Sequence, residues 1–436
     1  MNLGKICFTV SLICGSFGAA QNTATESAVC EKSTQSGVRV DLGKNGFLFR
    51  AKSDLDYRQE FPVDLAMKKS ISSLYSELKA SGYIVVAVPL PPRGLVEEKN
   101  IDYSRASSKD YDVKRAKTQY SAYVQAMRDA GFITVDGLKI ASNLSGDFYQ
   151  KTDHHWTDAA AQSVAFDIYE QISENLFYTS LPKKQFESKI VGETNISGSL
   201  TDEVKKYCVE TTIPNERLAK WKTQEINPAE QSLLDGDDPS VVILGTSHSL
   251  NSHANFQGFL QQNLQLDVVQ ASYSGAGAQG AMEHYFATDN LDRRPKILIW
   301  EFESSSAFFT NKNRIPTLTW MSNQIIPAIK NKCSTQGFET LINGNIISIP
   351  INTILKSDKP VNIRMRFEDL SIFNFNLIFK SSDGSSYTEI FNRHTSVKNS
   401  GYYYFKSDAL QNIKEVFIEI PKDNSVKGSF YLNSCI

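Results

Sequence analysis

Short apolar runs alternate with segments of helical periodicity over residues 40–325, and this alternation most limits how the chain can fold. The run at 84–89 lies between a glycine and a proline cluster, as expected of a strand buried on both faces. Further strands are predicted at 132–135, 241–244, 268–269 and 297–300, and helices at 65–78, 112–130, 158–175, 251–262 and 278–287. Such alternation favours a doubly wound parallel sheet, so the fold class predicted here is α/β. The segment 180–235 is polar and irregular, and we expect an insertion or long loop there.

The pattern changes after about residue 330. Short β-branched or aromatic runs separated by Asp, Asn, Gly and Ser are typical of an all-β sandwich. The predicted strands cover 346–351, 361–366, 373–379, 402–405, 416–420 and 429–432. A chain of 436 residues is long enough for two domains, which we place at 21–327 and 328–436.

The first twenty residues have the features of a signal peptide. Lys5 precedes an apolar stretch over 6–17, and small residues follow at 18–20. The stretch is too short to span a bilayer, so we expect export and cleavage after residue 20.

Four cysteines remain after this cleavage, and an even number in an exported chain suggests two disulfides. Three pairings are possible among Cys30, Cys208, Cys333 and Cys435. One bridge in each domain, Cys30–Cys208 and Cys333–Cys435, is the most economical pairing.

The charge balance argues against nucleic acid as a partner. Lysine and arginine total 46 against 48 aspartate and glutamate residues, which gives a net charge of −2 and no overall basic surface. From residue 325 onward, 13 basic residues face 10 acidic ones, so the C-terminal domain is the mildly basic part. That difference would suit a polyanionic ligand.

A candidate nucleophile follows the strand predicted at 241–244. Gly245 permits a sharp turn, and Ser247 would then lie at the junction between strand and helix, with its hydroxyl exposed. Ligands of open α/β sheets gather at this carboxyl edge of the strands. A strand followed by Gly and Ser is more often only a turn and a helix cap, so this motif alone is weak.

A second motif, at 149–157, strengthens the assignment. Alternate residues of an extended segment face the same side, so Asp153 and His155 can point together, with Thr157 as the N-cap of the next helix. Aspartate orients histidine and histidine deprotonates serine in a catalytic triad, whatever the chain order. A polar surface loop is the alternative. A metal site through His154 and His155 is less favoured because adjacent residues diverge and no H-x-H or H-E-x-x-H spacing is present.

Five ordered motifs together resemble the SGNH hydrolase-like alginate O-acetyltransferases of the AlgX and AlgJ group. They cover 43–49, 85–93, 152–157, 245–247 and 300–301, and the D-x-H-W-T motif of that family matches at 153–157. The C-terminal sandwich is similar to the family's carbohydrate-binding module. The chain departs from the family at Arg93, where a lysine is expected, and at Phe47, where a tryptophan is usual.

The resemblance implies a periplasmic enzyme that transfers acetyl to an exported uronate polysaccharide, with alginate as the leading candidate. Ser247 would attack the acetyl carbonyl, His155 would act as general base, and Asp153 would orient His155. No metal or other cofactor is expected, but an acetyl donor of unknown identity is required. Partners would be the anionic polysaccharide and the cell-envelope proteins of polysaccharide secretion and acetylation.

Further site residues are predicted around this triad. The backbone N–H of Ser247 is the first candidate oxyanion donor, and the glycine-rich stretch at Gly275, with Tyr273 nearby, is the candidate second. The candidate substrate contacts are Arg93, His248, His253, Lys380, Tyr387 and Arg393, although ordinary surface charge explains each of the last three as well.

Two alternatives remain open on the sequence alone. A secreted esterase or deacetylase would use the same triad, because water and a sugar hydroxyl attack the same acyl-enzyme. A non-catalytic polysaccharide-binding scaffold would not need Ser247 at all.

Overall fold

The structure is a computed structural model of the full chain. It describes residues 40–55, 61, 63–105, 108–207, 213–228, 239–287, 294–304, 318–330, 332–342, 344–350, 361–408, 410, 412–421 and 428–435. The predicted signal peptide and the predicted Cys30–Cys208 bridge lie outside these residues. In the described part of the chain, no helix combines the length and the apolar character needed to cross a membrane.

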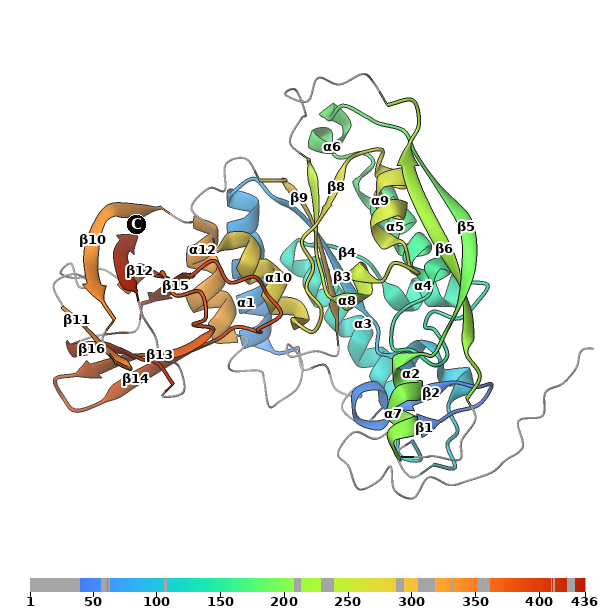
Figure 1. Cartoon of the computed structure of the whole chain (residues 1–436), viewed down its shortest axis with the longest axis horizontal. Helices are drawn as coiled ribbons and strands as arrows, with labels where there is room; N and C mark the ends of the chain where they lie inside the picture. The colour runs from blue at the N-terminus through green and yellow to red at the C-terminus, as the bar shows by residue number, and fades with distance from the viewer. Residues whose placement is uncertain are drawn as a thin grey trace, which may run out of the picture.

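A five-stranded parallel sheet, ordered β4-β3-β9-β7-β8, forms the centre of the larger part of the molecule (Figure 1). Its strands are β3 (Ile84–Leu90), β4 (Ile133–Thr134), β7 (Val241–Leu244), β8 (Val268–Gln270) and β9 (Ile297–Glu303). Successive side chains of a strand point to opposite faces. Val242 and Leu244 therefore enter one apolar core, and Val241 and Ile243 enter the other.

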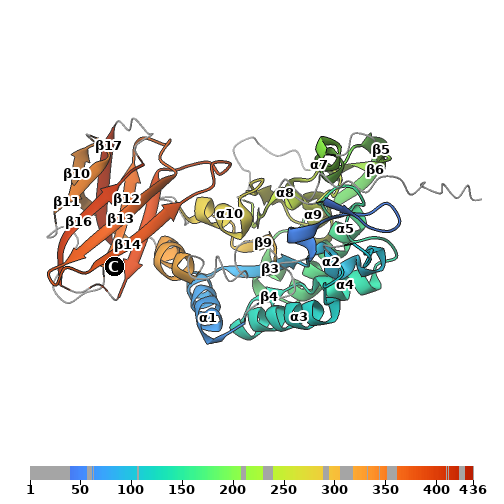
Figure 2. The same cartoon turned by 90° about the horizontal axis from the view of Figure 1, so that it is seen from below.

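Helices cover both faces of this sheet (Figure 2). One face packs against α1 (Leu65–Ala80), α3 (Val113–Ala130) and α10 (Gly277–Phe286), and the other against α4 (Gly137–Asn143), α5 (Asp158–Ile172) and α9 (Phe256–Leu264). The doubly wound α/β prediction is confirmed. Shorter elements are β1 (Val40–Leu42), β2 (Leu48–Arg50), η2 (Ala51–Leu55), α2 (Arg93–Val96), η4 (Glu98–Asn100), α6 (Leu176–Ser180), α8 (Ser247–Leu250), η5 (Trp320–Ile325) and α12 (Ile326–Lys330).

Of the two expectations for 180–235, the long loop is wrong, whereas the insertion stays a prediction. The segment contains β5 (Phe186–Ile196), α7 (Ser199–Tyr207) and β6 (Glu216–Glu225), and the two strands pair as an antiparallel hairpin. One face of the hairpin packs on α9, with the ring of Trp221 against Phe259. The other face is open to solvent, and this explains why the strands are too polar to be recognised from apolar content.

The C-terminal part is an all-β sandwich, as predicted. Its sheets are ordered β10-β17-β12-β15 and β11-β16-β13-β14, and both are antiparallel. The strands are β10 (Cys333–Leu341), β11 (Ile346–Ile349), β12 (Val361–Phe367), β13 (Asn374–Ser381), β14 (Ser386–Asn392), β15 (Tyr402–Ser407), β16 (Ile413–Glu419) and β17 (Ser429–Cys435). The sequence patterns missed β10 and β14, each of which is one of the two edge strands of its sheet.

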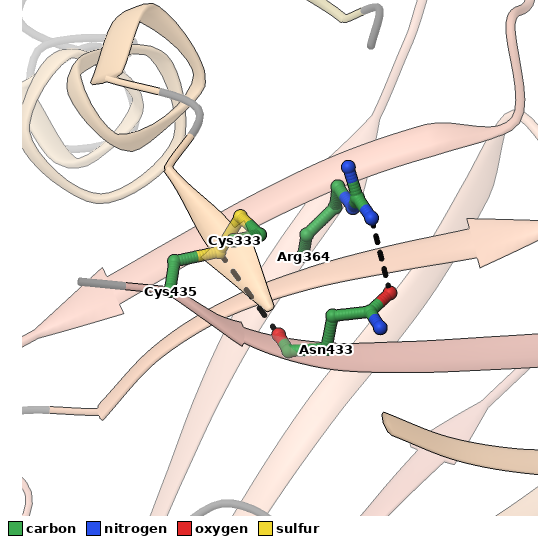
Figure 3. Close-up of a disulfide and its surroundings, with 4 residues drawn as sticks. All are labelled: Cys333, Arg364, Asn433 and Cys435. Atoms are coloured by element: carbon green, nitrogen blue, oxygen red, sulfur yellow. Dashed lines mark hydrogen bonds between the residues drawn. A yellow bond between two sulfur atoms is a disulfide. The ribbon is translucent and has the colours of Figure 1, made fainter. Parts of the chain in front are cut away.

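The predicted Cys333–Cys435 disulfide is present and joins the first strand of the sandwich to its last (Figure 3). Beside it, Arg364 of β12 donates a hydrogen bond of 3.3 Å to the side-chain oxygen of Asn433 (Figure 3). The bridge closes a segment of about a hundred residues, since its cysteines are 102 positions apart.

The α/β part and the sandwich meet at β15, and we call this contact the seam. The inward β15 residues Tyr403 and Phe405 belong to the sandwich core, whereas Tyr404 packs into the core of the α/β part. The helices α1, α10 and α12 lie between the parallel sheet and the sandwich (Figures 1 and 2). The predicted boundary between residues 327 and 328 falls within α12 and stays a prediction.

Candidate active site

Ser247 lies at the carboxyl edge of the central sheet, as the first residue of the short helix α8. It follows β7 through Gly245 and Thr246, and it is partly exposed. A Cβ on Gly245 would lie 2.5 Å from Ser249 Oγ and 2.8 Å from Glu301 Oε2, so the close packing of this turn requires glycine.

Glu301, near the carboxyl end of β9, binds this turn through its side chain. Its carboxylate is fully buried and accepts hydrogen bonds from the Thr246 backbone at 2.8 Å and the Ser249 hydroxyl at 2.7 Å. The Thr246 hydroxyl also donates to it, at 2.9 Å. Ser247 is therefore flanked on both sides by residues tied to one carboxylate.

Asp153 and His155 form the expected pair. The Asp153 carboxylate accepts a 2.6 Å hydrogen bond from His155 Nδ1 and a 2.7 Å bond from the backbone N–H of Ser199, the first residue of α7. Burial alone would raise the pKa of Asp153, but these hydrogen bonds and the nearby imidazole outweigh it and hold the pKa well below its usual range. The buried His155 Nε2 has no hydrogen-bond partner among the described residues, so it is available to a reacting group.

The His155 ring is brought to the nucleophile turn by packing around Trp156 and His248. Trp156 is completely buried and donates from Nε1 to the His248 carbonyl at 2.9 Å. The His155 and His248 rings have centroids 5.1 Å apart, and His248 is the residue that follows Ser247. The structure therefore places the 153–156 loop directly against the segment that carries Ser247.

Three supports fix the 151–153 backbone. The Arg93 guanidinium donates to the carbonyls of Lys151 and Asp153, each at 2.7 Å. Glu216, at the start of β6, accepts from the backbone N–H of Lys151 at 2.9 Å and from the Thr152 hydroxyl at 2.5 Å. A Cβ on Gly198 would lie 2.2 Å from the Thr152 carbonyl oxygen, so only glycine permits this approach.

A second set of charges lies beside the triad. Glu303 accepts a 3.0 Å hydrogen bond from His248 Nε2 and pairs with Arg50 at 3.5 Å. Burial would raise the pKa of Glu303, but Arg50 and His248 lower it well below its usual range. Burial and the neighbouring His155 and His248 lower the pKa of His154 to about 3, so His154 is neutral at ordinary pH.

The same loop also forms a cluster of potential metal ligands, because ligand atoms of Asp153, His154 and His155 lie within 4.8 Å of one another. The Asp153 oxygens already accept from His155 and Ser199, and His154 Nδ1 is 2.7 Å from the Ser199 hydroxyl. These pairings use the Asp153 oxygens and the Nδ1 atoms of both histidines within the protein, which fits a triad better than a metal site.

The remaining predicted residues have varied positions. Arg93 and His248 were predicted to contact substrate, but they are 2% and 1% exposed, and their side chains contact the catalytic loop and Glu303 instead. Their side chains therefore bind other groups of the protein, and a direct contact with substrate stays a prediction. His253 Nδ1 lies 3.3 Å from the Ala219 carbonyl of the hairpin.

The three predicted substrate contacts of the C-terminal domain do not lie on the catalytic loop. Lys380 pairs with Glu415 at 3.3 Å on the sandwich surface. Tyr387 bonds to Glu389 and to Asn323 of η5, at the seam. Arg393 lies over the Tyr403 ring and donates to the Tyr402 carbonyl.

Two of the three predicted oxyanion residues, Tyr273 and Gly275, lie in the loop after β8, and the third, Ser247, begins α8. The Tyr273 backbone N–H donates to the Gly245 carbonyl at 3.0 Å, so this group is already occupied. Gly275 has a positive φ of 74° and remains a candidate. The Tyr273 ring packs edge-on against His284.

Sequence reasoning missed the supporting acids Glu216 and Glu303, and it assigned no role to Glu301 although this residue belongs to the motif at 300–301. Glu301 and Glu303 had a usable signal, because two carboxylates end an otherwise apolar strand. No signal in the sequence pointed to Glu216, since its strand was not recognised.

Comparison with known proteins places this site in context. Residues 40–304 match the family model described as the SGNH hydrolase-like domain of acetyltransferase AlgX. The chain is 32% identical over 260 residues to the alginate biosynthesis protein AlgX of Pseudomonas syringae pv. tomato, a match over 59% of this chain and 53% of that protein. It is 24% identical to the probable alginate O-acetylase AlgJ of Pseudomonas aeruginosa, over 60% of this chain and 69% of that protein.

The comparison of folds covers more of the chain than the comparison of sequences does. A solved structure of Pseudomonas aeruginosa AlgX superposes with a TM-score of 0.76 and covers 92% of this chain and 94% of that one, at 24% identity. At this identity the likeness supports the fold alone. In sequence, the match to the curated AlgX protein of Pseudomonas syringae spans about half of that protein's length.

Proposed function

The chain belongs to the family of SGNH hydrolase-like domains of acetyltransferase AlgX, and on this premise we propose that it is a polysaccharide O-acetyltransferase. The observation that carries the proposal is the Asp153–His155 pair, bonded at 2.6 Å, with a buried and unpartnered His155 Nε2 beside the nucleophile turn. This is the arrangement that a serine nucleophile needs.

The reaction proceeds through an acetyl-serine. His155 Nε2 takes the proton from the Ser247 hydroxyl as the oxygen attacks the acetyl carbonyl of the donor, and Asp153 stabilises the imidazolium that forms. His155 then returns the proton to the departing donor group. In the second half, His155 deprotonates a sugar hydroxyl, which attacks the acetyl carbonyl of the acetyl-serine. The bond between this carbonyl and Ser247 Oγ then breaks, and His155 returns the proton to Ser247.

The acceptor we propose is an alginate-like uronate polysaccharide, and the location is the periplasm. Support for the acceptor comes from the relatives, which are named for alginate biosynthesis and alginate O-acetylation. Support for the location comes from the signal-like residues 1–20. Cell-envelope proteins of polysaccharide secretion would supply the polymer and the acetyl group. The proposed mechanism assigns no step to a metal or other cofactor.

The test is to incubate the purified protein with a chromogenic acetyl ester and mannuronate oligomers, and to weigh the oligomers by mass spectrometry. We expect gains of about 42 Da for each acetyl transferred. Ser247→Ala should abolish both ester cleavage and transfer, whereas the exposed Ser142→Ala on α4 should change neither.

The outcomes separate the three functions. Ester cleavage without any mass gain on the oligomers would favour an esterase. Transfer that survives Ser247→Ala would contradict the triad, and a protein that binds oligomers but neither cleaves nor transfers would be a scaffold.

A further inference from the structure

The β5–β6 hairpin has one face on α9 and one face open to solvent, and the open face carries lysines. Trp221 and Thr223 of β6 lie on the α9 side, so alternation along the strand puts Lys220 and Lys222 on the open face. The register places Lys189 of β5 opposite Lys222, and therefore on the same face. All three lysines are exposed, and we call the surface around them the lysine face.

The acids of the hairpin do not neutralise the lysine face. Glu187 pairs with Lys189 at 2.7 Å, whereas Glu216 is bonded to the catalytic loop. Lys220 and Lys222 form no ion pair with any of the described residues. The face therefore presents two exposed ammonium groups that a ligand can pair with.

The pairing of Lys189 with Lys222 is unfavourable by itself. The two residues are directly opposite in an antiparallel pair, where like charges repel each other. An anionic ligand that lies over both ammonium groups would remove this repulsion. The neighbouring cross-strand pair is Gly192 with Lys220, and a Cβ on Gly192 would have no atom within 4 Å. The face therefore offers open space beside its charges.

Apolar side chains adjoin the lysines. The β-bulge of β5 lies between Ile190 and Gly192, and Ile190 and Val191 are 58% and 62% exposed. Lysine stems add further apolar surface below their ammonium groups. A uronate unit has apolar C–H groups on its ring and a carboxylate at its edge, so both kinds of surface have a counterpart in it.

The exposure of the lysines favours a polymer over a small anion. A single exposed ion pair contributes little, because water and salt screen it. A chain with a carboxylate on every unit can contact several lysines together, and linked contacts gain from a high effective concentration. The occupant that fits these charges is a polyuronate.

The lysine face starts near the catalytic loop. β6 begins at Glu216, which accepts from the Lys151 backbone, and the Ala219 carbonyl lies 3.3 Å from His253 Nδ1. Lys220 is four residues after Glu216, or roughly 13 Å at the usual rise of a strand. The hairpin runs along α9 between α6 and α7 (Figure 1). A chain that lies along β6 therefore leads toward the catalytic loop.

We propose that the lysine face binds the uronate chain of the acceptor outside the active site and guides it toward the catalytic loop. The inference rests on the proposed function, because it takes the acceptor to be a uronate polysaccharide. Binding to the lysine face does not, however, depend on the chemistry of Ser247.

The test measures the affinity of a fluorescein-labelled mannuronate decamer for the full-length protein by fluorescence anisotropy. Lys220→Gln/Lys222→Gln should weaken decamer binding about three- to ten-fold, because two ion pairs are lost, and the difference should shrink as the salt concentration rises. A labelled β-1,4-mannose decamer, which lacks the carboxylates, should show no dependence on the two lysines. Cleavage of a small acetyl ester should be unchanged in this variant.

The matched control is Lys69→Gln/Lys114→Gln. It removes the same charge from exposed positions of α1 and α3, which cover the opposite face of the parallel sheet from α9. The control should bind the mannuronate decamer as wild type does. Equal decamer affinity in wild type and the hairpin variant, or an equal loss in the control, would overturn the proposal.

Two other roles of the lysines have their own outcomes. Lysines on exposed strands also prevent pairing between sheet edges, so self-association of the hairpin variant with unchanged decamer affinity would overturn the proposal. Lysine-dependent binding to phosphatidylglycerol vesicles without decamer binding would also overturn it and assign the face to an anionic lipid surface. Failure of the proposed function is scored separately, by acetyl-ester cleavage in wild type and Ser247→Ala, and the latter should bind the decamer normally.

Discussion

At the scale of single residues, the site depends on a carboxylate kept ionised in a largely buried position. Asp153 is 8% exposed, and it is stabilised by hydrogen bonds from His155 and from the backbone of Ser199. A buried carboxylate needs such partners, since desolvation alone favours the neutral acid. The same contacts fix the imidazole orientation that proton transfer requires.

Replacement of Asp153 by asparagine should lower ester turnover by on the order of 10³- to 10⁴-fold, because the amide stabilises the wrong histidine tautomer.

The lowered pKa of Asp153 also predicts how the stability of the fold depends on pH. The ionised carboxylate stabilises the fold above the unfolded-state pKa of about 3.9, and this contribution is lost as the pH falls. The melting temperature of Asp153→Asn should therefore be below that of wild type at pH 7, and the difference should shrink below about pH 3.

His154 should have no part in the pH dependence of the reaction. Its pKa is lowered to about 3 by burial and by the neighbouring histidines, so it stays neutral between pH 4 and pH 9. We expect His154→Asn to leave the midpoint of the acid limb of the pH–rate profile unchanged. A displaced midpoint would show that His154 titrates with the catalytic groups.

At the scale of elements, the β5–β6 hairpin and α7 act as a support for the catalytic loop. Glu216 accepts from the 151–152 backbone, and α7 begins with the N–H that binds Asp153. Negative charge is favoured at a helix N-terminus, so the start of α7 is a suitable partner for this carboxylate.

Substitution of Glu216 by glutamine should lower the kcat of ester cleavage clearly, whereas the melting temperature should fall only slightly. The amide would present N–H to backbone donors and lose charge-assisted bonds worth about 1.5–3 kcal/mol. Kinetics of ester cleavage and a melting curve provide the comparison. Glu193→Gln on the same hairpin is the control, because its pair with Arg217 is exposed and contributes little. Equal losses in both variants would argue against a positioning role for Glu216.

At the scale of the whole molecule, the sandwich reaches the loop that borders the nucleophile. The Ser396 hydroxyl donates to the Ser274 carbonyl at 2.6 Å, and a Cβ on Gly275 would lie 3.3 Å from the His394 ring. The same loop is tied to the nucleophile turn through the bond from Tyr273 to Gly245. The two domains are therefore joined by a short path of contacts that ends at the active site.

Ser396→Ala should lower kcat several-fold with little change in melting temperature, because one hydrogen bond contributes about 0.5–1.5 kcal/mol. The neighbouring exposed residue provides the control, Thr395→Ala. An effect confined to KM for the polymer would indicate that Ser396 binds substrate and does not position the loop.

The Cys333–Cys435 bridge should contribute about 2–4 kcal/mol to stability, because it closes a long segment of the chain. The variant with both cysteines replaced by serine should show a lower unfolding midpoint in denaturant. Ester cleavage at low temperature should persist, since the bridge lies in the sandwich. An unchanged midpoint would show that the closing strands pair equally well without the bridge.

The local pattern of the sequence was sufficient to predict the buried strands and the pairing of the catalytic side chains. Apolar runs such as 241–244 indicate buried parallel strands because both faces of the sheet are covered, and the spacing of Asp153 and His155 is enough to point both side chains the same way. The Cys333–Cys435 pairing was the most economical of three possible pairings, and it is present in the sandwich.

Only the tertiary structure decided what supports the site. Arg93 and His248 are typical substrate-binding residue types, but long-range packing buries them and turns their polar groups toward the catalytic loop and Glu303. The hairpin that supplies Glu216 and the helix that supplies Ser199 were hidden by their polar sequences. Hydrogen bonds between residues 60 or more positions apart, such as that from Arg93 to Asp153, depend on how elements pack, and local periodicity contains no information about that packing.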